Sequence, residues 1–227
     1  MTIKICVSVP PETVAEALNL IEKAENQRAD LIEVRLDSLK EHKKLADIAH
    51  CSSTPLIATN RSTECQGKFL GSETERKKIL LDAARNGFEY VDVELSTPRL
   101  KEIVGNLRGM GIKPITSFHD FDETPSSSQL NEILRKEIAS GAEVCKIVTT
   151  ARLVDDNLTV LDFVSKASKS ARMVCFSMGD LGKPSRLLSP VFGAFFTIAS
   201  LESGRKTASG QLTIREMKTI YEALGLK

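Results

Sequence analysis

The chain has 227 residues and a formal net charge of +1, so overall charge does not indicate a nucleic acid or an acidic surface as a partner. Hydrophobic residues make up 41% of it, enough for a substantial core, and 27% is charged, as in ordinary globular proteins. Only 5% is aromatic and Trp is absent, which argues against a base-stacking surface for nucleic acids.

Five cysteines and one apolar stretch bear on the cellular compartment. No two cysteines have C-x-x-C spacing, and Cys6, Cys145 and Cys175 lie in apolar runs, where they resemble small buried hydrophobes. The first residues lack the apolar segment of a signal peptide, and the most hydrophobic stretch, residues 191–201, is too short to span a bilayer. We therefore expect a soluble cytoplasmic protein without a membrane partner.

Strand-like and helix-like segments alternate along the whole chain. Residues 3–9 are rich in β-branched side chains, and in residues 11–26 apolar side chains recur at helical spacing. The later strand-like segments are residues 29–37, 55–61, 88–95, 113–120, 142–150, 171–179 and 195–201. The helix-like segments that follow them are residues 43–51, 72–87, 97–111, 126–141, 157–170, 185–192 and 213–225.

Helix boundary signals support several of these segments. Ser72 and Glu75 suit a capping box, and Gly87 suits the end of the same helix. Pro98 fits the first turn of the next one.

Eight strand–helix units without a break in composition predict a parallel sheet covered by helices. Eight such units close on themselves in a (β/α)₈ TIM barrel, and this chain is near the short end of the range for that fold. We predict one barrel domain over residues 1–227, with a doubly wound open sheet as the alternative.

Polar side chains stand at or near the ends of the predicted strands, where barrels of this kind carry their active sites. The spacing between them stays close to the length of one unit, so we expect them at similar heights in one mouth of the barrel. They are Glu33, Arg35, Arg61, Asp92, Glu94, Ser117, His119, Lys146 and Ser177, followed by Thr207, Ser209 and Gln211 in the loop after the last strand.

Lys146 lies in the middle of an apolar strand. One interpretation is a structural lysine that reaches the strand edge or pairs with Asp92 or Glu94. The other is a catalytic amine whose pKa is lowered by burial and by cations such as Arg35 or Arg61. A neutral amine can attack a ketone and form a Schiff base.

His119 precedes Lys146 by one strand, so the two side chains can face one small ligand from two sides. Its ordinary pKa suits proton transfer near neutral pH. The surrounding segment, SFHDFDET, also holds three carboxylates and by itself would fit a metal cluster. The barrel prediction places those carboxylates in the loop before the next helix, which favours a histidine that works without a metal.

Arg186 follows the seventh predicted strand. It fits either a solvated arginine at a helix start or a bidentate clamp on a ligand carboxylate. No Walker A loop, G-x-G-x-x-G stretch or zinc-ligand spacing is present, which weakens nucleotide and metal hypotheses.

The ordered motifs EVRLD, NRS, VDVEL, SFHD, CKIV, SMG, SRL and ASGQ resemble those of the type I 3-dehydroquinate dehydratases of the shikimate pathway, which serves aromatic amino acid biosynthesis. The resemblance runs from the second predicted strand to the C-terminus. It implies a carbon–oxygen lyase in which Lys146 forms a Schiff base with the ketone of 3-dehydroquinate and His119 is the general acid and base. It also implies a homodimer and no cofactor, because the lysine supplies the electron sink.

Further roles follow from the same resemblance. Glu33, Arg35 and Arg61 match substrate-contacting positions, Arg186 the carboxylate-binding arginine and Gln211 a glutamine near the substrate hydroxyls. A hydroxyl residue is expected four positions before that glutamine, which is Thr207, although Ser209 is an alternative. We expect the loop from Gly204 to Gln211 to be mobile and to close over substrate.

One position departs from the family pattern. A glutamate that orients the histidine is expected four residues after Arg61, but this chain has Cys65 there. Glu64 by a one-residue shift, or Glu94, could take its place.

Two other functions remain compatible with the sequence. A class I aldolase would also use a barrel lysine, with the Gly-rich MGDLG segment as a phosphate site. A non-catalytic barrel that binds a small acid is the second. The apolar SPVFGAFF segment could be a dimer interface or part of the core.

Overall fold

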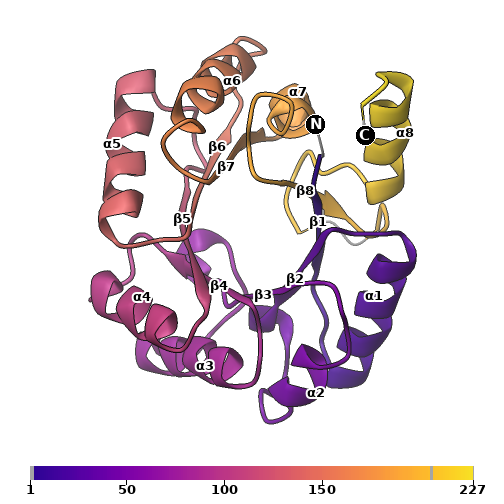
Figure 1. Cartoon of the computed structure of the whole chain (residues 1–227), viewed down its shortest axis with the longest axis vertical. Coiled ribbons are helices and arrows are strands. Elements are labelled where there is room, and N and C mark those ends of the chain that lie inside the picture. The colour runs from indigo at the N-terminus through magenta and orange to yellow at the C-terminus, as the bar shows by residue number, and fades with distance from the viewer. Residues whose placement is uncertain (1–2, 205–206, 227) are drawn as a thin grey trace.

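Eight parallel strands form the centre of the fold in a computed structural model that describes residues 3–204 and 207–226. Figure 1 looks into the ring that the strands form. The strands are β1 (Ile5–Val9), β2 (Leu31–Arg35), β3 (Leu56–Thr59), β4 (Tyr90–Glu94), β5 (Lys113–His119), β6 (Val144–Thr150), β7 (Met173–Met178) and β8 (Thr197–Ser200).

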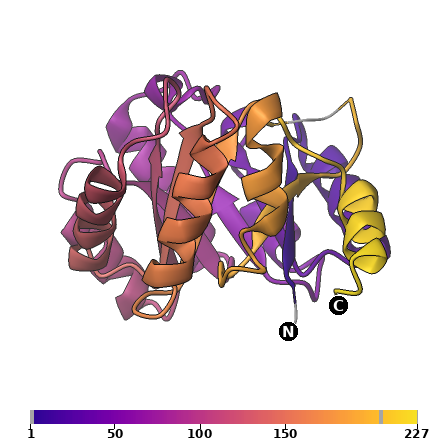
Figure 2. The same ribbon diagram turned by 90° about the horizontal axis from the view of Figure 1, so that it is seen from above.

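The α-helices alternate with the strands and surround them, as Figures 1 and 2 show. Among the described residues they are α1 (Val14–Asn26), α2 (Leu45–Ala49), α3 (Glu73–Arg85), α4 (Leu100–Gly109), α5 (Ser127–Ala139), α6 (Asp156–Ala167), α7 (Lys183–Leu188) and α8 (Ile214–Ala223). Helices α2 and α7 are short, with 5 and 6 residues.

Sheet pairing confirms the predicted barrel over the open sheet. Each strand pairs with the next from β1 to β7, and β8 pairs with β1. Within the described part of the chain no ladder joins β7 to β8, but Phe195 N donates to Met173 O at 2.7 Å across this seam. The ring is therefore nearly closed, with a seam beside the strands that carry the last two loops.

Apolar side chains fill both faces of the sheet, as expected for parallel strands covered by helices. Inside the barrel, Cys6, Leu31, Ile57, Ile115 and their neighbours form one cluster. Two other clusters lie between the sheet and the helices. Because the barrel interior is packed in this way, the charged groups that face into the barrel lie toward the C-terminal ends of the strands.

Local signals were mostly correct. Ser72 and Glu75 form the predicted capping box at the start of α3, and Gly87 follows this helix with φ of 104°. The prediction for Pro98 was wrong, because α4 begins only at Leu100. Arg99, with a left-handed φ of 61°, separates the proline from the helix.

No helix in the described ranges has the combination of length and apolar character needed to cross a membrane.

Candidate active site

A cavity of about 260 Å³ lies at the C-terminal ends of the strands. The residues that were given a role from the sequence line it, except Glu64 and Glu94, whereas Asp92, Ser117 and Ser177, also expected in the barrel mouth, are not part of its lining. The predicted residues in its wall are Glu33, Arg35, Arg61, His119, Lys146, Arg186, Thr207, Ser209 and Gln211.

Lys146 on β6 is 4% exposed and points its amine at two carboxylates. Its Nζ donates to Asp92 at 2.9 Å and to Glu33 at 3.2 Å. Burial alone would lower the pKa of Lys146, but these carboxylates outweigh burial and raise it above its usual value. The interpretation with a lowered pKa was therefore wrong, and the alternative pairing with Asp92 is confirmed, because ion pairs with β2 and β4 keep the ligand-free amine protonated.

Glu33 is fixed before any ligand arrives. Ser8 donates to one of its carboxylate oxygens at 2.5 Å, and Thr59 donates to the other at 2.9 Å. Burial would raise the pKa of Glu33, but Lys146 and Arg35 bring it to about 2. Glu33 is thus an ionised group in a fixed orientation beside the amine.

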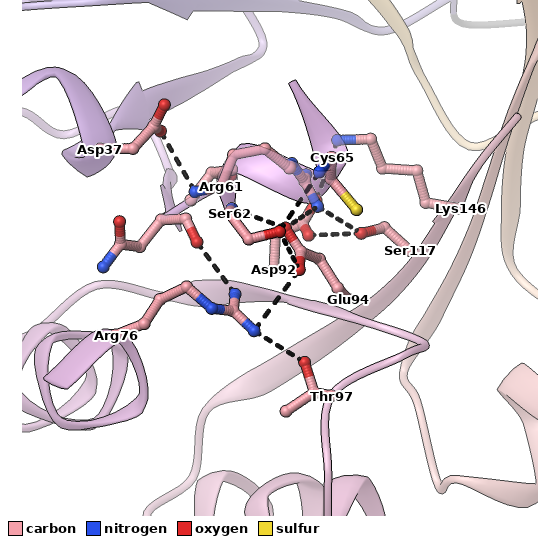
Figure 3. Close-up of polar contacts among 12 residues, drawn as sticks. Asp37, Arg61, Ser62, Cys65, Arg76, Asp92, Glu94, Thr97, Ser117 and Lys146 are labelled. Atoms are coloured by element: carbon pink, nitrogen blue, oxygen red, sulfur yellow. Dashed lines mark hydrogen bonds and ion pairs between the residues drawn. The ribbon is translucent and has the colours of Figure 1, made fainter. Parts of the chain in front are cut away.

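Arg61 follows β3 and is 4% exposed. Its guanidinium lies 3.0 Å from Asp92 and donates to Ser117 Oγ at 2.8 Å, and Ser117 in turn donates to Asp92 at 2.6 Å (Figure 3). Asp92 therefore bridges Arg61 and Lys146. Burial raises the pKa of Asp92, but the two cations hold it well below its usual range.

Arg35 at the end of β2 forms a two-pronged ion pair with Asp37, at 2.8 and 2.7 Å. Asp37 also accepts from the backbone N–H groups of Arg61 and Lys68. This carboxylate therefore joins the loops after β2 and β3, and it presents Arg35 at the cavity wall with little freedom.

His119 ends β5 and stacks on Phe121, with ring centroids 5.8 Å apart and an interplanar angle of 12°. Its Nδ1 is buried and has no hydrogen-bond partner among the described residues. Burial, together with the charges of Arg61 and Lys146, holds the pKa of His119 well below its usual value. The imidazole is therefore neutral in the ligand-free site.

Neither carboxylate considered as a partner for His119 contacts it. Glu64 is exposed, and it lines a neighbouring cavity together with Glu94. Glu94 is buried but bonds to Ser62 and lies near two arginines instead. Cys65 lines the main cavity, so a thiol stands where the family pattern has a carboxylate.

Arg186 on α7 is 1% exposed, unlike a solvated helix-start arginine. Among the residues that the structure describes, it donates only to two carbonyls, Ile198 O at 3.3 Å and Ser209 O at 3.4 Å. Its guanidinium lies 4.2 Å from the ring centroid of Phe176. No carboxylate pairs with it within the described ranges, and its Nε has no partner there. Burial lowers the pKa of Arg186 to about 9. A buried cation without an anion in a cavity wall is suited to bind an anionic ligand.

The loop after β8 completes the wall. Gln211 is 2% exposed, accepts from Thr207 N at 2.8 Å and donates to Thr207 Oγ1 at 2.9 Å. Both Thr207 and Ser209 line the cavity. Residues 205 and 206 of this loop lie outside the described residues, and the predicted closing motion stays a prediction.

Several contributors had been given no role in the site. Asp92 was expected in the barrel mouth and as a possible partner of Lys146 only, Phe121 was merely a neighbour of His119 in SFHDFDET, and Ser8 had no motif that marked it. Phe176 looked like an ordinary core residue of an apolar strand, although its ring supports Arg186.

The fold and the cavity define a (β/α)₈ barrel protein with a polar ligand site at the strand ends, where a buried lysine, a histidine and a buried arginine face one space. A family model described as type I 3-dehydroquinase matches residues 5–227. The chain belongs to this family.

Individual relatives agree with the family match. A protein of Dehalococcoides mccartyi named 3-dehydroquinate dehydratase is 36% identical over 97% of this chain and 95% of its own length. The crystal structure of the 3-dehydroquinate dehydratase from Aquifex aeolicus is 27% identical, with a TM-score of 0.82 over 97% of this chain and 98% of that one. The structure of the Geobacillus kaustophilus enzyme, at 24% identity, supports the fold alone, with a TM-score of 0.92 over 99% and 92% of the two chains.

Proposed function

We propose that the protein is a 3-dehydroquinate dehydratase that removes water from 3-dehydroquinate through a Schiff base at Lys146. One observation carries this proposal: a single cavity holds an amine, a neutral imidazole and a buried arginine without an anion. The substrate offers a matching ketone, carbon acid and carboxylate.

Arg186 binds the substrate carboxylate in this proposal. The partnerless Nε and the long bonds from its other nitrogens to carbonyls leave its donors available to an incoming anion. The arginine fork suits a carboxylate by geometry. Anchoring this end of the substrate directs its ketone toward the opposite wall.

Lys146 must lose its ammonium proton before it can act as a nucleophile. His119, which is neutral in the ligand-free site, accepts that proton when substrate binds. In the ligand-free site the lowered pKa of His119 and the raised pKa of Lys146 keep the proton on the amine. The amine then adds to the ketone carbon, and one of its protons moves to the ketone oxygen to give a carbinolamine. His119 returns its proton to this hydroxyl, so that water leaves, an iminium ion forms and His119 is again neutral. Asp92 and Glu33, which neutralise the ammonium in the ligand-free site, stabilise the iminium charge in the same positions.

His119 then carries out the elimination. It removes a proton from the carbon next to the iminium, and the bonding electrons move toward nitrogen to give an enamine. The enamine returns its electrons, the β-hydroxyl breaks away, and His119 donates its proton to it, so that water forms. Hydrolysis of the imine releases 3-dehydroshikimate and restores Lys146.

Other cavity residues select the substrate. Glu33 and Arg35 hold fixed positions that suit hydroxyl recognition, and so does Arg61. Gln211 bonds to both the backbone N–H and the hydroxyl of Thr207, and this fixed position favours Thr207 over Ser209 as the hydroxyl contact. We further propose that the protein is a cytoplasmic enzyme of the shikimate pathway. It would consist of one barrel domain and form a homodimer, and light scattering would measure the mass of this assembly in solution.

Turnover tests the proposal. We expect the wild-type protein to convert 3-dehydroquinate to a product with the ultraviolet absorbance of a conjugated enone, without added metal or cofactor. Lys146→Ala should lose about 1,000-fold or more, and His119→Ala about 100- to 10,000-fold. Lys136→Ala on the exposed face of α5 serves as the matched control and should retain full activity. A wild-type protein that leaves 3-dehydroquinate unchanged, or prefers a phosphorylated sugar, would reject the proposal.

A further inference from the structure

A second buried polar cluster lies behind Arg61, away from the catalytic cavity. Figure 3 shows Glu94 of β4 and Arg76 of α3 on the side of Arg61 opposite Lys146. Both side chains are buried, with residue exposures of 3% and 2%. They line a separate polar cavity of about 310 Å³. Burying two ionised groups outside the reaction site is costly, which calls for an explanation.

Glu94 holds the residue that follows Arg61. One of its carboxylate oxygens accepts from Ser62 N at 2.9 Å, and the other accepts from Ser62 Oγ at 2.9 Å. The first oxygen also lies 3.6 Å from the guanidinium of Arg61. A single carboxylate thus fixes the backbone and side chain of Ser62 and attracts the Arg61 side chain.

Arg76 holds the residue that precedes Arg61. Its Nη1 donates to Asn60 O at 3.0 Å, and its Nη2 donates to Thr97 Oγ1 at 2.9 Å and lies 3.4 Å from Glu94. On its outer side, Glu73 accepts from it at 2.7 and 2.9 Å. Both neighbours of Arg61 in the chain are therefore fastened to the Glu94–Arg76 pair.

The same contacts set the position of the adjoining cavity wall. Ser62 Oγ accepts from Cys65 N at 3.3 Å and caps the short 3-10 helix η2 (Thr63–Cys65). Cys65 and Gln66 line the catalytic cavity beside Arg61. A change at Glu94 would be transmitted through Ser62 to this wall, although Glu94 is not among the residues that line the catalytic cavity.

We propose that Glu94 and Arg76 form a positioning pair that fixes Arg61 and the wall at Cys65 and Gln66. The effect on catalysis rests on the proposed role of Arg61 as a substrate ligand. Glu94 then acts on substrate binding through Arg61, and not on the proton chemistry of His119. The carboxylate attracts the Arg61 guanidinium and holds the Arg61–Ser62 backbone, and Arg76 compensates its charge.

Steady-state kinetics distinguishes an effect on substrate binding through Arg61 from an effect on the proton chemistry of His119. In Glu94→Gln and Arg76→Lys we expect KM for 3-dehydroquinate to rise about 10- to 100-fold, because hydrogen bonds to charged groups are lost. The kcat at saturation should fall much less, because Lys146 and His119 keep their own contacts. Ser62→Ala removes only one of the two bonds to Glu94 and should give a smaller rise in KM. Arg85→Met, on the same helix as Arg76 but with a side chain 57% exposed, is the matched control.

A thiol-labelling measurement is independent of the reaction. In a Cys51→Ser background, which removes the exposed cysteine, the rate at which iodoacetamide alkylates Cys65 reports on the wall. We expect the rate to rise at least about threefold in folded Glu94→Gln and Ser62→Ala, because local opening becomes more frequent. The folded state is checked by thermal unfolding of each variant.

The outcomes are distinct. Unchanged KM and unchanged Cys65 labelling in folded Glu94→Gln would overturn the positioning pair, and so would a collapse of kcat at constant KM. If Glu94→Gln and Arg76→Lys fail to fold, Ser62→Ala decides by the same two criteria. An inactive wild-type protein would reject the proposed function instead, while the labelling rates would still test the positioning of the wall.

Discussion

Replacing Arg186 with methionine should weaken substrate binding without lowering the stability of the fold. The substitution keeps an unbranched side chain against Phe176 but removes the guanidinium. Truncating one partner of a buried charge pair costs about 2–5 kcal/mol, or about 30- to several-thousand-fold in kcat/KM. We therefore expect Arg186→Met to lose that much activity, mainly through weaker binding of the substrate carboxylate.

The ligand-free protein should not suffer from the same change. Burial lowers the pKa of Arg186 to about 9 from 12.5, which corresponds to a penalty of about 5 kcal/mol on the charged form. Two long hydrogen bonds to carbonyls and the contact with the Phe176 ring offset this penalty only in part. Removing the cation should therefore leave the unfolding temperature equal to that of the wild type or higher.

Thermal unfolding with and without substrate, combined with steady-state kinetics, measures both effects. The control is Arg215→Met, an exposed arginine on α8 that should change neither quantity. Activity of Arg186→Met within about threefold of the wild type would refute the carboxylate-binding role. A large loss of stability would show that the arginine is mainly a structural bridge of the seam between β7 and β8.

Two further predictions concern protonation. Because the folded pKa of His119 lies below 6.5, the imidazole stays neutral as pH falls through 6.5, and the acid limb of kcat/KM should appear only at lower pH. A limb at or above pH 6.5 would contradict a buried neutral base. Glu137 on α5 is fully buried, and burial raises its pKa well above 4.5. The folded protein therefore holds this proton more tightly than the unfolded chain does, and stability is lost as pH rises above 4.5. Glu137→Met should stabilise the protein by about 1–3 kcal/mol at neutral pH and by less at pH 4.5, as measured by chemical unfolding. A Glu137→Met variant whose free energy of unfolding changes by the same amount at both pH values, or falls at neutral pH, would contradict this prediction.

The strands were predictable because parallel strands buried on both faces appear as continuous apolar runs. The barrel followed from their number and even spacing. The helix start predicted at Pro98 was wrong because the sequence gives no sign that Arg99 adopts a left-handed conformation, after which α4 begins at Leu100. Such a residue is set by the packing of the turn and not by local propensity.

The cavity residues were predictable from their recurrence at strand ends, and Asp92 was one of two partners considered for Lys146, but most of the other partners were not predictable. The protonation of Lys146 depends on Glu33 and Asp92, which come from strands 113 and 54 positions away in the chain. Arg76 was part of a helix pattern, and only the packing of α3 against β3 and β4 directs it toward Glu94. Contacts between elements of this kind carry no local sequence signal.

The central claim is a covalent imine at Lys146, and borohydride trapping tests it most directly. The protein is mixed with 3-dehydroquinate, reduced with borohydride, digested and mapped by mass spectrometry. We expect a stable adduct on the peptide that contains Lys146, absent without substrate and absent from Lys146→Ala. An active protein that gives no adduct, or an adduct on another lysine, would contradict the account.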